Sequence, residues 1–170
     1  MQKKKPNVVV LAGGSSMEAE VSRQSAAQVQ RALQNSGFQV AVVELDKDCA
    51  SRLLKIQPDV VFPALHGPPG EDGTVQGLLE ILEICYVGSD VRGSAMAMDK
   101  AVAKSIFKRQ GLPVIDDYIV AADADLNATA GEIERLLGPN VVTKPLNQGS
   151  ALGVQLLPNG GDITAALAQC

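Results

Sequence analysis

Residues 60–73 read VVFPALHGPPGEDG, and this stretch decides the fold class. A short apolar run, typical of a buried strand, ends at His66, which is the only histidine of the chain. A loop rich in glycine and proline follows, and then two acids, Glu71 and Asp72, open an amphipathic helical pattern. Ligands of parallel α/β sheets bind just past the carboxyl ends of strands, where a histidine can offer a proton or a positive charge. An isolated histidine would favour a simple loop role, but this context favours ligand binding by His66.

Apolar runs and helical patterns alternate on both sides of this stretch. Strands are predicted at residues 8–12, 38–45, 60–65 and 84–87. Helical patterns follow the first three of these strands, and such alternation predicts a doubly wound parallel sheet. We therefore expect an α/β domain over residues 1–94.

A different pattern begins near residue 95, and we expect a second, partial domain over residues 95–170. One long helix is predicted over residues 95–110 and another over 128–137. Strands are predicted at residues 118–121, 141–144 and 154–157, and a last helix begins near residue 164. The sheet of this second domain looks unfinished.

The composition excludes several classes of protein. The 170 residues are 46% hydrophobic and 20% charged, which is ordinary for a soluble globular protein. A net charge of −4, with Lys3-Lys4-Lys5 as the only basic tract, argues against a nucleic-acid partner. No apolar run is long enough to span a membrane. Three widely spaced cysteines match no metal or redox pattern, and Cys85 is expected to be buried, so we expect a cytoplasmic protein and assign no metal ligand.

A second candidate site lies after the first strand, where Gly13-Gly14-Ser15-Ser16 opens a helix. Free backbone N–H groups at a helix N-terminus attract anions and carboxylates. Glu18 follows Ser15 at the spacing of a capping box. The loop alone leaves both interpretations of Glu18 open, as a capping acid or as a ligand-binding carboxylate.

A third candidate site is the loop over residues 145–153, which is rich in small residues and is preceded by Lys144. Such a loop can bring backbone N–H groups close to phosphate oxygens, while the lysine neutralises their charge. The lysine precedes the glycines, so this is not a P-loop of the usual kind. Lys100 lies within the predicted helix 95–110 and, taken alone, would be a surface residue.

Together these segments resemble one family, the D-alanine–D-alanine ligases of the ATP-grasp superfamily, over its N-terminal half. The segments that carry the resemblance are LAGGSSMEAEVS (11–22), LHGPPGEDGTVQG (65–77), YVGS (86–89), AMDK (97–100), GLPV (111–114), KP (144–145) and GSALGV (149–154). The resemblance implies an N-terminal substrate domain followed by the beginning of an ATP-grasp central domain. It also implies a reaction in which ATP phosphorylates the carboxylate of one D-alanine. The amine of a second D-alanine then attacks the acyl phosphate, and the dipeptide feeds peptidoglycan synthesis.

The resemblance further implies roles for individual residues. Glu18 would hold the ammonium group of the first D-alanine, and His66 would lie near the substrate carboxylates. Ser150 would share a hydrogen-bond network with Glu18. Lys100 and Lys144 would bind ATP phosphates, together with Ser150 and Ala151. Many family members have a second serine where this chain has Ala151, whose backbone N–H could still reach a phosphate.

The resemblance also implies that the chain is incomplete. The ligands of Mg²⁺ and the adenine pocket would lie in a further part of the ligase, so we expect the chain alone to be inactive. The expected partners are D-alanine, ATP and a second copy of the protein in a homodimer. A D-alanine–D-lactate ligase, another ATP-grasp amino-acid ligase and a non-catalytic binding module remain as alternatives.

Overall fold

The computed structural model describes residues 5–170, whose contacts divide into two compact units at the junction of Met98 and Asp99. The first unit is built around strand β1 (Asn7–Ala12), which pairs in parallel with β2 (Gln39–Glu44) and β3 (Val60–Pro63). Parallel neighbours need a crossover connection. Helix α1 (Ala19–Asn35) connects β1 to β2, and α2 (Cys49–Ile56) connects β2 to β3.

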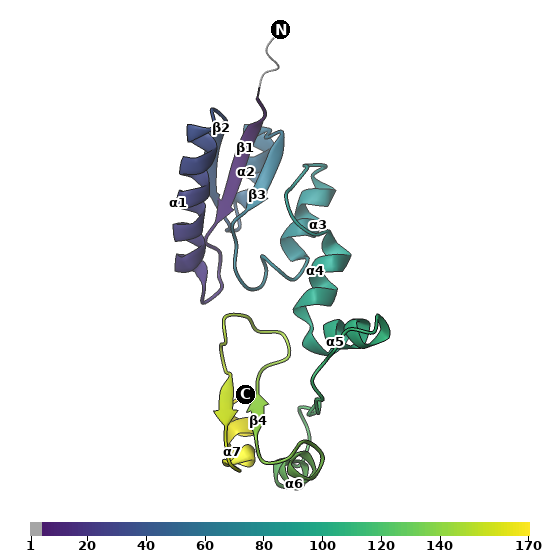
Figure 1. Ribbon diagram of the computed structural model, residues 1–170. Coiled ribbons are helices and arrows are strands. Elements are labelled where there is room, and N and C mark those ends of the chain that lie inside the picture. The colour runs from purple at the N-terminus through teal and green to yellow at the C-terminus, as the bar shows by residue number, and fades with distance from the viewer. Residues whose placement is uncertain (1–4) are drawn as a thin grey trace. The chain divides into compact units, whose positions relative to one another are not determined.

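Helices cover both faces of this sheet (Figure 1). On one face, Ala26, Val29 and Leu33 of α1 pack against Val10 and Ala12. The other face carries the larger cluster, in which α2 and α3 (Thr74–Ile81) supply buried leucines and valines: Leu53, Val75 and Leu79 against Val9, Leu11 and Val61. A strand covered on both faces is apolar without alternation, which explains the run VVVLA. The predicted doubly wound parallel α/β fold is confirmed.

The predicted fourth strand over residues 84–87 is wrong. Only Tyr86 makes a ladder contact, an isolated parallel bridge to Val61, before α4 (Val91–Met98) begins. Cys85, which we expected to be buried, is exposed, whereas Cys49 is buried. A run of four apolar residues is too short to predict whether the segment forms a strand or which of its side chains are buried.

The N-terminal basic tract falls partly outside the described residues, which exclude Lys3 and Lys4. Lys5 does not extend freely into solvent. Its ammonium group donates to the carbonyl oxygen of Ser36 and lies 5.1 Å from the ring centroid of Phe38. Among residues 5–170, no helix is long and apolar enough to cross a membrane.

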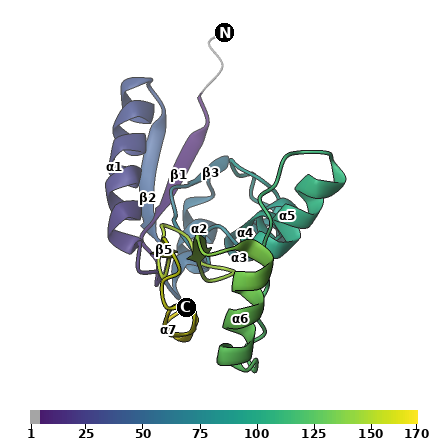
Figure 2. The same ribbon diagram turned by 60° about the horizontal axis from the view of Figure 1, so that its bottom comes forward.

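The second unit contains an antiparallel pair, β4 (Val141–Thr143) and β5 (Gln155–Leu157), joined by the loop that follows Lys144 (Figures 1 and 2). Helix α6 (Leu126–Leu137) precedes the pair and α7 (Ile163–Ala168) follows it. Three buried residues form the centre of its core: Ile133, Val141 and Ile163.

Two predictions for the second unit are wrong. Residues 95–110 do not form one helix, because α4 ends at Met98 and α5 (Lys100–Arg109) begins after Asp99. The Asp99 carboxylate accepts hydrogen bonds from the N–H groups of Ala101 and Val102, which is the bonding of a helix N-cap. Residues 118–121 are not a strand; they pack on the core of this unit through Tyr118 and Val120. Packing thus accounts for their alternating pattern without any strand partner.

Candidate functional site

The loop after β1 does not form the predicted capping box. Helix α1 begins at Ala19, so Glu18 is its N-cap residue and makes no side-chain capping bond. The hydroxyl of Ser16 instead accepts a hydrogen bond from the Glu18 N–H at 3.2 Å and donates to the carbonyl of His66 at 2.8 Å. The capping interpretation of Glu18 is therefore excluded.

Glu18 and the His66 loop lie side by side at the carboxyl ends of β1 and β3. Glu18 is only 9% exposed. A Cβ atom placed on Gly67 would come within 2.8 Å of the Glu18 Oε2 atom, and Gly67 adopts a left-handed φ of 68°. Any side chain at position 67 would be strained and would displace this carboxylate. The structure thus brings together Glu18 and His66, two of the residues singled out in the sequence.

The His66 loop is held by contacts that the sequence did not reveal. The Gly67 N–H donates to the Glu71 carboxylate at 2.7 Å, so this acid folds back on the loop instead of opening α3. The Nε2 atom of the His66 ring lies 3.1 Å from the hydroxyl of Ser25 on α1. The backbone and the ring of His66 are therefore each tied to another part of the first unit.

Ser22 joins the ends of two strands beneath this site. Its hydroxyl donates to the carbonyl of Ala64 at 2.6 Å and accepts from the N–H of Gly13 at 2.8 Å. Ser22 is 0% exposed, so both bonds form away from water. Ser22 and Ser25 are three residues apart and share one side of α1. Their spacing on a helix that is otherwise packed by small apolar residues was the signal that could have identified them.

An ion pair lies against the Gly13–Gly14 turn. The Arg23 Nη2 atom is 2.7 Å from the Glu44 Oε1 atom, and Glu44 also accepts from the Gly14 N–H at 3.4 Å. The hydrogen bond from Arg23 lowers the pKa of the Glu44 carboxyl below its ordinary value. Gly13 has a left-handed φ of 73°, and a Cβ there would displace the Glu44 carboxylate. The backbone conformation of the turn therefore favours glycine.

Lys100 and Lys144 lie near one another in the second unit. Lys100 is the first residue of α5, and its ammonium group donates to the carbonyl oxygens of Leu146 at 3.0 Å and Gln148 at 2.7 Å. Burial lowers the pKa of Lys100, and the positive charge of Lys144 lowers it further. Two neighbouring positive charges favour a bound anion, since an anion relieves their repulsion.

The loop between β4 and β5 is unusually shaped. Ser150 and Ala151 both adopt left-handed backbones, with φ of 46° and 57°. Gly153 is also left-handed, and a Cβ there would lie 2.7 Å from the Pro145 Cγ atom. Non-glycine residues in this conformation are strained, and such strain gathers at ligand sites. The loop that the sequence predicts to bind phosphate thus closes on Pro145.

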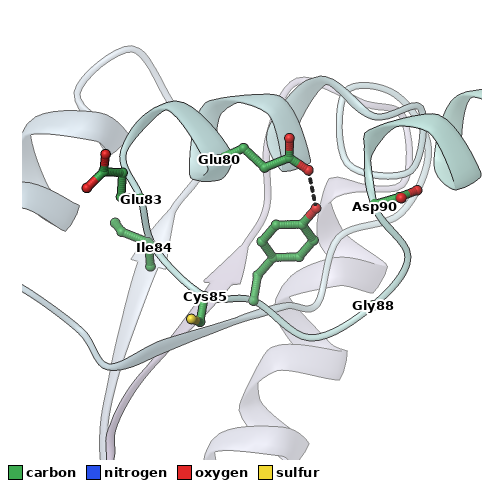
Figure 3. A pocket seen from close by; sticks show the side chains of 7 residues that line it. Glu80, Glu83, Ile84, Cys85, Gly88 and Asp90 are labelled. Atoms are coloured by element: carbon green, nitrogen blue, oxygen red, sulfur yellow. Dashed lines mark hydrogen bonds between the residues drawn. The ribbon is translucent and has the colours of Figure 1, made fainter.

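A hollow in the first unit, drawn in Figure 3, contains none of the predicted site residues. It is lined by Glu80, Glu83, Ile84, Cys85, Tyr86, Gly88 and Asp90. The dashed bond in Figure 3 runs from the Tyr86 hydroxyl to Glu80, at 2.9 Å. Within residues 5–170 no group of three or more histidine, cysteine or acidic side chains is placed to hold a metal ion.

Comparison with solved structures shows that the fold is shared with D-alanine–D-alanine ligases. A D-alanine–D-alanine ligase from Bacillus anthracis matches 96% of this chain with 52% of its own, at a TM-score of 0.80 and 32% identity. The same enzyme complexed with ATP matches 96% of this chain with 53% of its own, at a TM-score of 0.77 and 30% identity.

Sequence comparison names the family more narrowly. Residues 49–89 match the family model described as D-ala D-ala ligase N-terminus. The D-alanine–D-alanine ligase of Ruegeria sp. strain TM1040 is 44% identical over 152 residues, which are 89% of this chain and 48% of that protein. The chain spans about half the length of the curated relatives it matches. The resemblance to the N-terminal half of D-alanine–D-alanine ligases is confirmed.

Proposed function

We propose that the chain forms the N-terminal half of a D-alanine–D-alanine ligase, which joins two D-alanines at the expense of ATP through an acyl phosphate. The observation that carries this proposal is the approach of Glu18 to the His66 loop at the carboxyl ends of adjacent strands. A mostly buried carboxylate attracts an ammonium group, and a nearby histidine can attract a carboxylate. Those two groups are the ends of an amino-acid zwitterion.

The second unit supplies the groups for the other substrate. Lys144 is exposed and close enough to Lys100 to lower its pKa, so it is the lysine we assign to direct contact with the phosphates of ATP. Lys100 donates hydrogen bonds to two loop carbonyls, so it also stabilises the shape of the loop. The backbone N–H groups of Ser150 and Ala151 are assigned to phosphate oxygens. The relative that was solved in complex with ATP supports ATP as the ligand.

The remaining features of the proposal follow from the family. The reaction occurs in the cytoplasm, the dipeptide serves peptidoglycan synthesis, and the protein acts as a homodimer. Mg²⁺ is held by residues in the other half of the ligase. Magnesium would neutralise charge on the phosphoryl group as it is transferred.

A hybrid ligase tests the proposed function. Residues 1–170 are fused to the part of the Ruegeria ligase that lies beyond its match to this chain. Phosphate release and D-Ala-D-Ala are then measured with ATP, magnesium and D-alanine. We expect D-alanine-dependent turnover in the hybrid and none in the unfused chain. A folded hybrid that binds ATP and D-alanine without turnover would instead favour a non-catalytic binding module.

A further inference from the structure

Ser25 approaches the ring of His66 although 41 positions separate the two residues. The Ser25 Oγ atom lies 3.1 Å from the His66 Nε2 atom, in a partly buried setting. Ser25 comes from α1, whereas His66 follows β3. The sequence offered no reason to connect the two, and none of the roles assigned above uses Ser25.

The backbone on both sides of the His66 side chain is already fixed. Its carbonyl oxygen accepts from the Ser16 hydroxyl at 2.8 Å, and the next N–H, that of Gly67, donates to Glu71 at 2.7 Å. The freedom that remains to His66 is rotation of its side chain. Histidine χ2 is a broad torsion with two nearly equivalent ring orientations. A partner for one ring nitrogen is therefore what decides which nitrogen faces the site.

A hydroxyl suits this task in every charge state of the ring. It can donate to an unprotonated Nε2, and it can accept from a protonated Nε2 of the neutral or the charged ring. A carboxylate or an ammonium group would favour one charge state over the other. The contact with Ser25 uses Nε2, so Nδ1 is the ring nitrogen that we assign to a ligand.

We propose that Ser25 is a positioning residue for His66: it holds the ring by Nε2 and so presents Nδ1 to the carboxylate of the bound amino acid. The proposal rests on the function proposed above, because it assigns His66 to a substrate carboxylate. Ser25 itself does not touch the substrate.

The first test observes the ring directly and needs no catalysis. His66 is the only histidine, so its ring nitrogens are the only imidazole signals in a ¹⁵N NMR spectrum of the chain. We expect Ser25→Ala to change the ¹⁵N shifts of the ring and the balance of its two tautomers. Ser25→Thr keeps the hydroxyl and should keep both. Ser51→Ala, at an exposed helix serine, is the control and should leave the spectrum unchanged. A spectrum of Ser25→Ala that matches the wild type would overturn the proposal.

The second test uses the hybrid ligase. We expect Ser25→Ala to lower kcat/KM for D-alanine roughly fivefold to tenfold, near the worth of one neutral hydrogen bond, with the KM for ATP unchanged. Ser25→Thr should restore most of the loss. A purely structural bond would instead lower the urea midpoint and leave kcat/KM for D-alanine unchanged, which would overturn the proposal.

The two tests separate this proposal from the proposed function. An inactive hybrid that carries Ser25 contradicts the ligase function, while the NMR comparison still decides whether Ser25 orients His66. An active hybrid in which Ser25→Ala has wild-type kinetics contradicts the positioning role alone.

Discussion

The hydroxyl of Ser16 donates a hydrogen bond to the main-chain carbonyl of His66 at 2.8 Å. This bond fastens the loop after β1 to the loop after β3, two segments that are 50 positions apart. Because the two loops are joined in this way, Glu18 and Gly67 are neighbours. The proposed amino-acid site is thus shaped by a hydrogen bond between the two loops before any substrate arrives.

Replacing Ser22 should destabilise the first unit. Ser22→Ala removes the hydroxyl that joins Ala64 to Gly13, and it leaves buried polar groups without partners. We expect a loss of about 1–3 kcal/mol in the free energy of unfolding, measured by urea denaturation. Ser51→Ala, on the exposed side of α2, is the control and should stay within about 0.5 kcal/mol of the wild type. Equal effects for the two variants would contradict the bridging role of Ser22.

Glu18→Gln in the hybrid ligase should weaken D-alanine binding far more than ATP binding. A carboxylate facing an ammonium group forms a charge-assisted bond worth roughly 1.5–3 kcal/mol, so the dissociation constant of D-alanine should rise about tenfold or more. Isothermal titration calorimetry with each ligand gives the dissociation constants of D-alanine and of ATP. Glu20→Gln is the matched control, since Glu20 is nearby but exposed and paired with Arg23. If affinity for both ligands fell equally, Glu18 would have a general structural role.

Lys144→Ala should weaken ATP binding without much change in stability. Its ammonium group is exposed, so its removal should change the free energy of unfolding by no more than about 0.5 kcal/mol. The loss of a charge-assisted contact to phosphate should lower the ATP affinity of the hybrid about tenfold or more. Titration of ATP and a urea melt of each variant separate the two effects. Lys55→Ala, an exposed lysine on α2, controls for the change in net charge, and unchanged ATP affinity in folded Lys144→Ala would remove Lys144 from the site.

Acid should weaken the Gly13–Gly14 turn through Glu44. The bond from Arg23 lowers the folded-state pKa of Glu44 below the ordinary value of 4.5. Its contribution to stability is therefore complete above pH 4.5 and is lost as the pH falls through the lowered pKa. Urea melts from pH 7 to pH 3 should show a shallower acid loss for Glu44→Gln than for the wild type. The difference in stability loss between the two proteins should be small, because the Arg23–Glu44 ion pair is partly exposed. Parallel curves for the two proteins would contradict this contribution.

Much of the first unit could be predicted from local pattern. Buried parallel strands are continuous apolar runs, so β1, β2 and β3 were visible in the sequence, and the helices between them followed from periodicity. Short elements were less predictable. The run at residues 84–87 forms only one bridge, and Asp99 divides a helical pattern by capping α5. In both places a single tertiary or side-chain contact outweighed local propensity.

The sequence alone indicated the α/β class, the order of the helical connections between strands and the three loops that carry the candidate chemistry. It did so because hydrophobic periodicity and glycine placement are local properties of the chain. Three findings needed the folded structure: Glu18 is no capping acid, Ser16 and Ser25 hold His66, and Lys100 donates to carbonyls of the loop between β4 and β5. Each of these depends on a hydrogen bond between segments about 40 to 50 positions apart, or on the absence of a local one. Such bonds are set by how the strands and helices pack, and no spacing in the sequence encodes them.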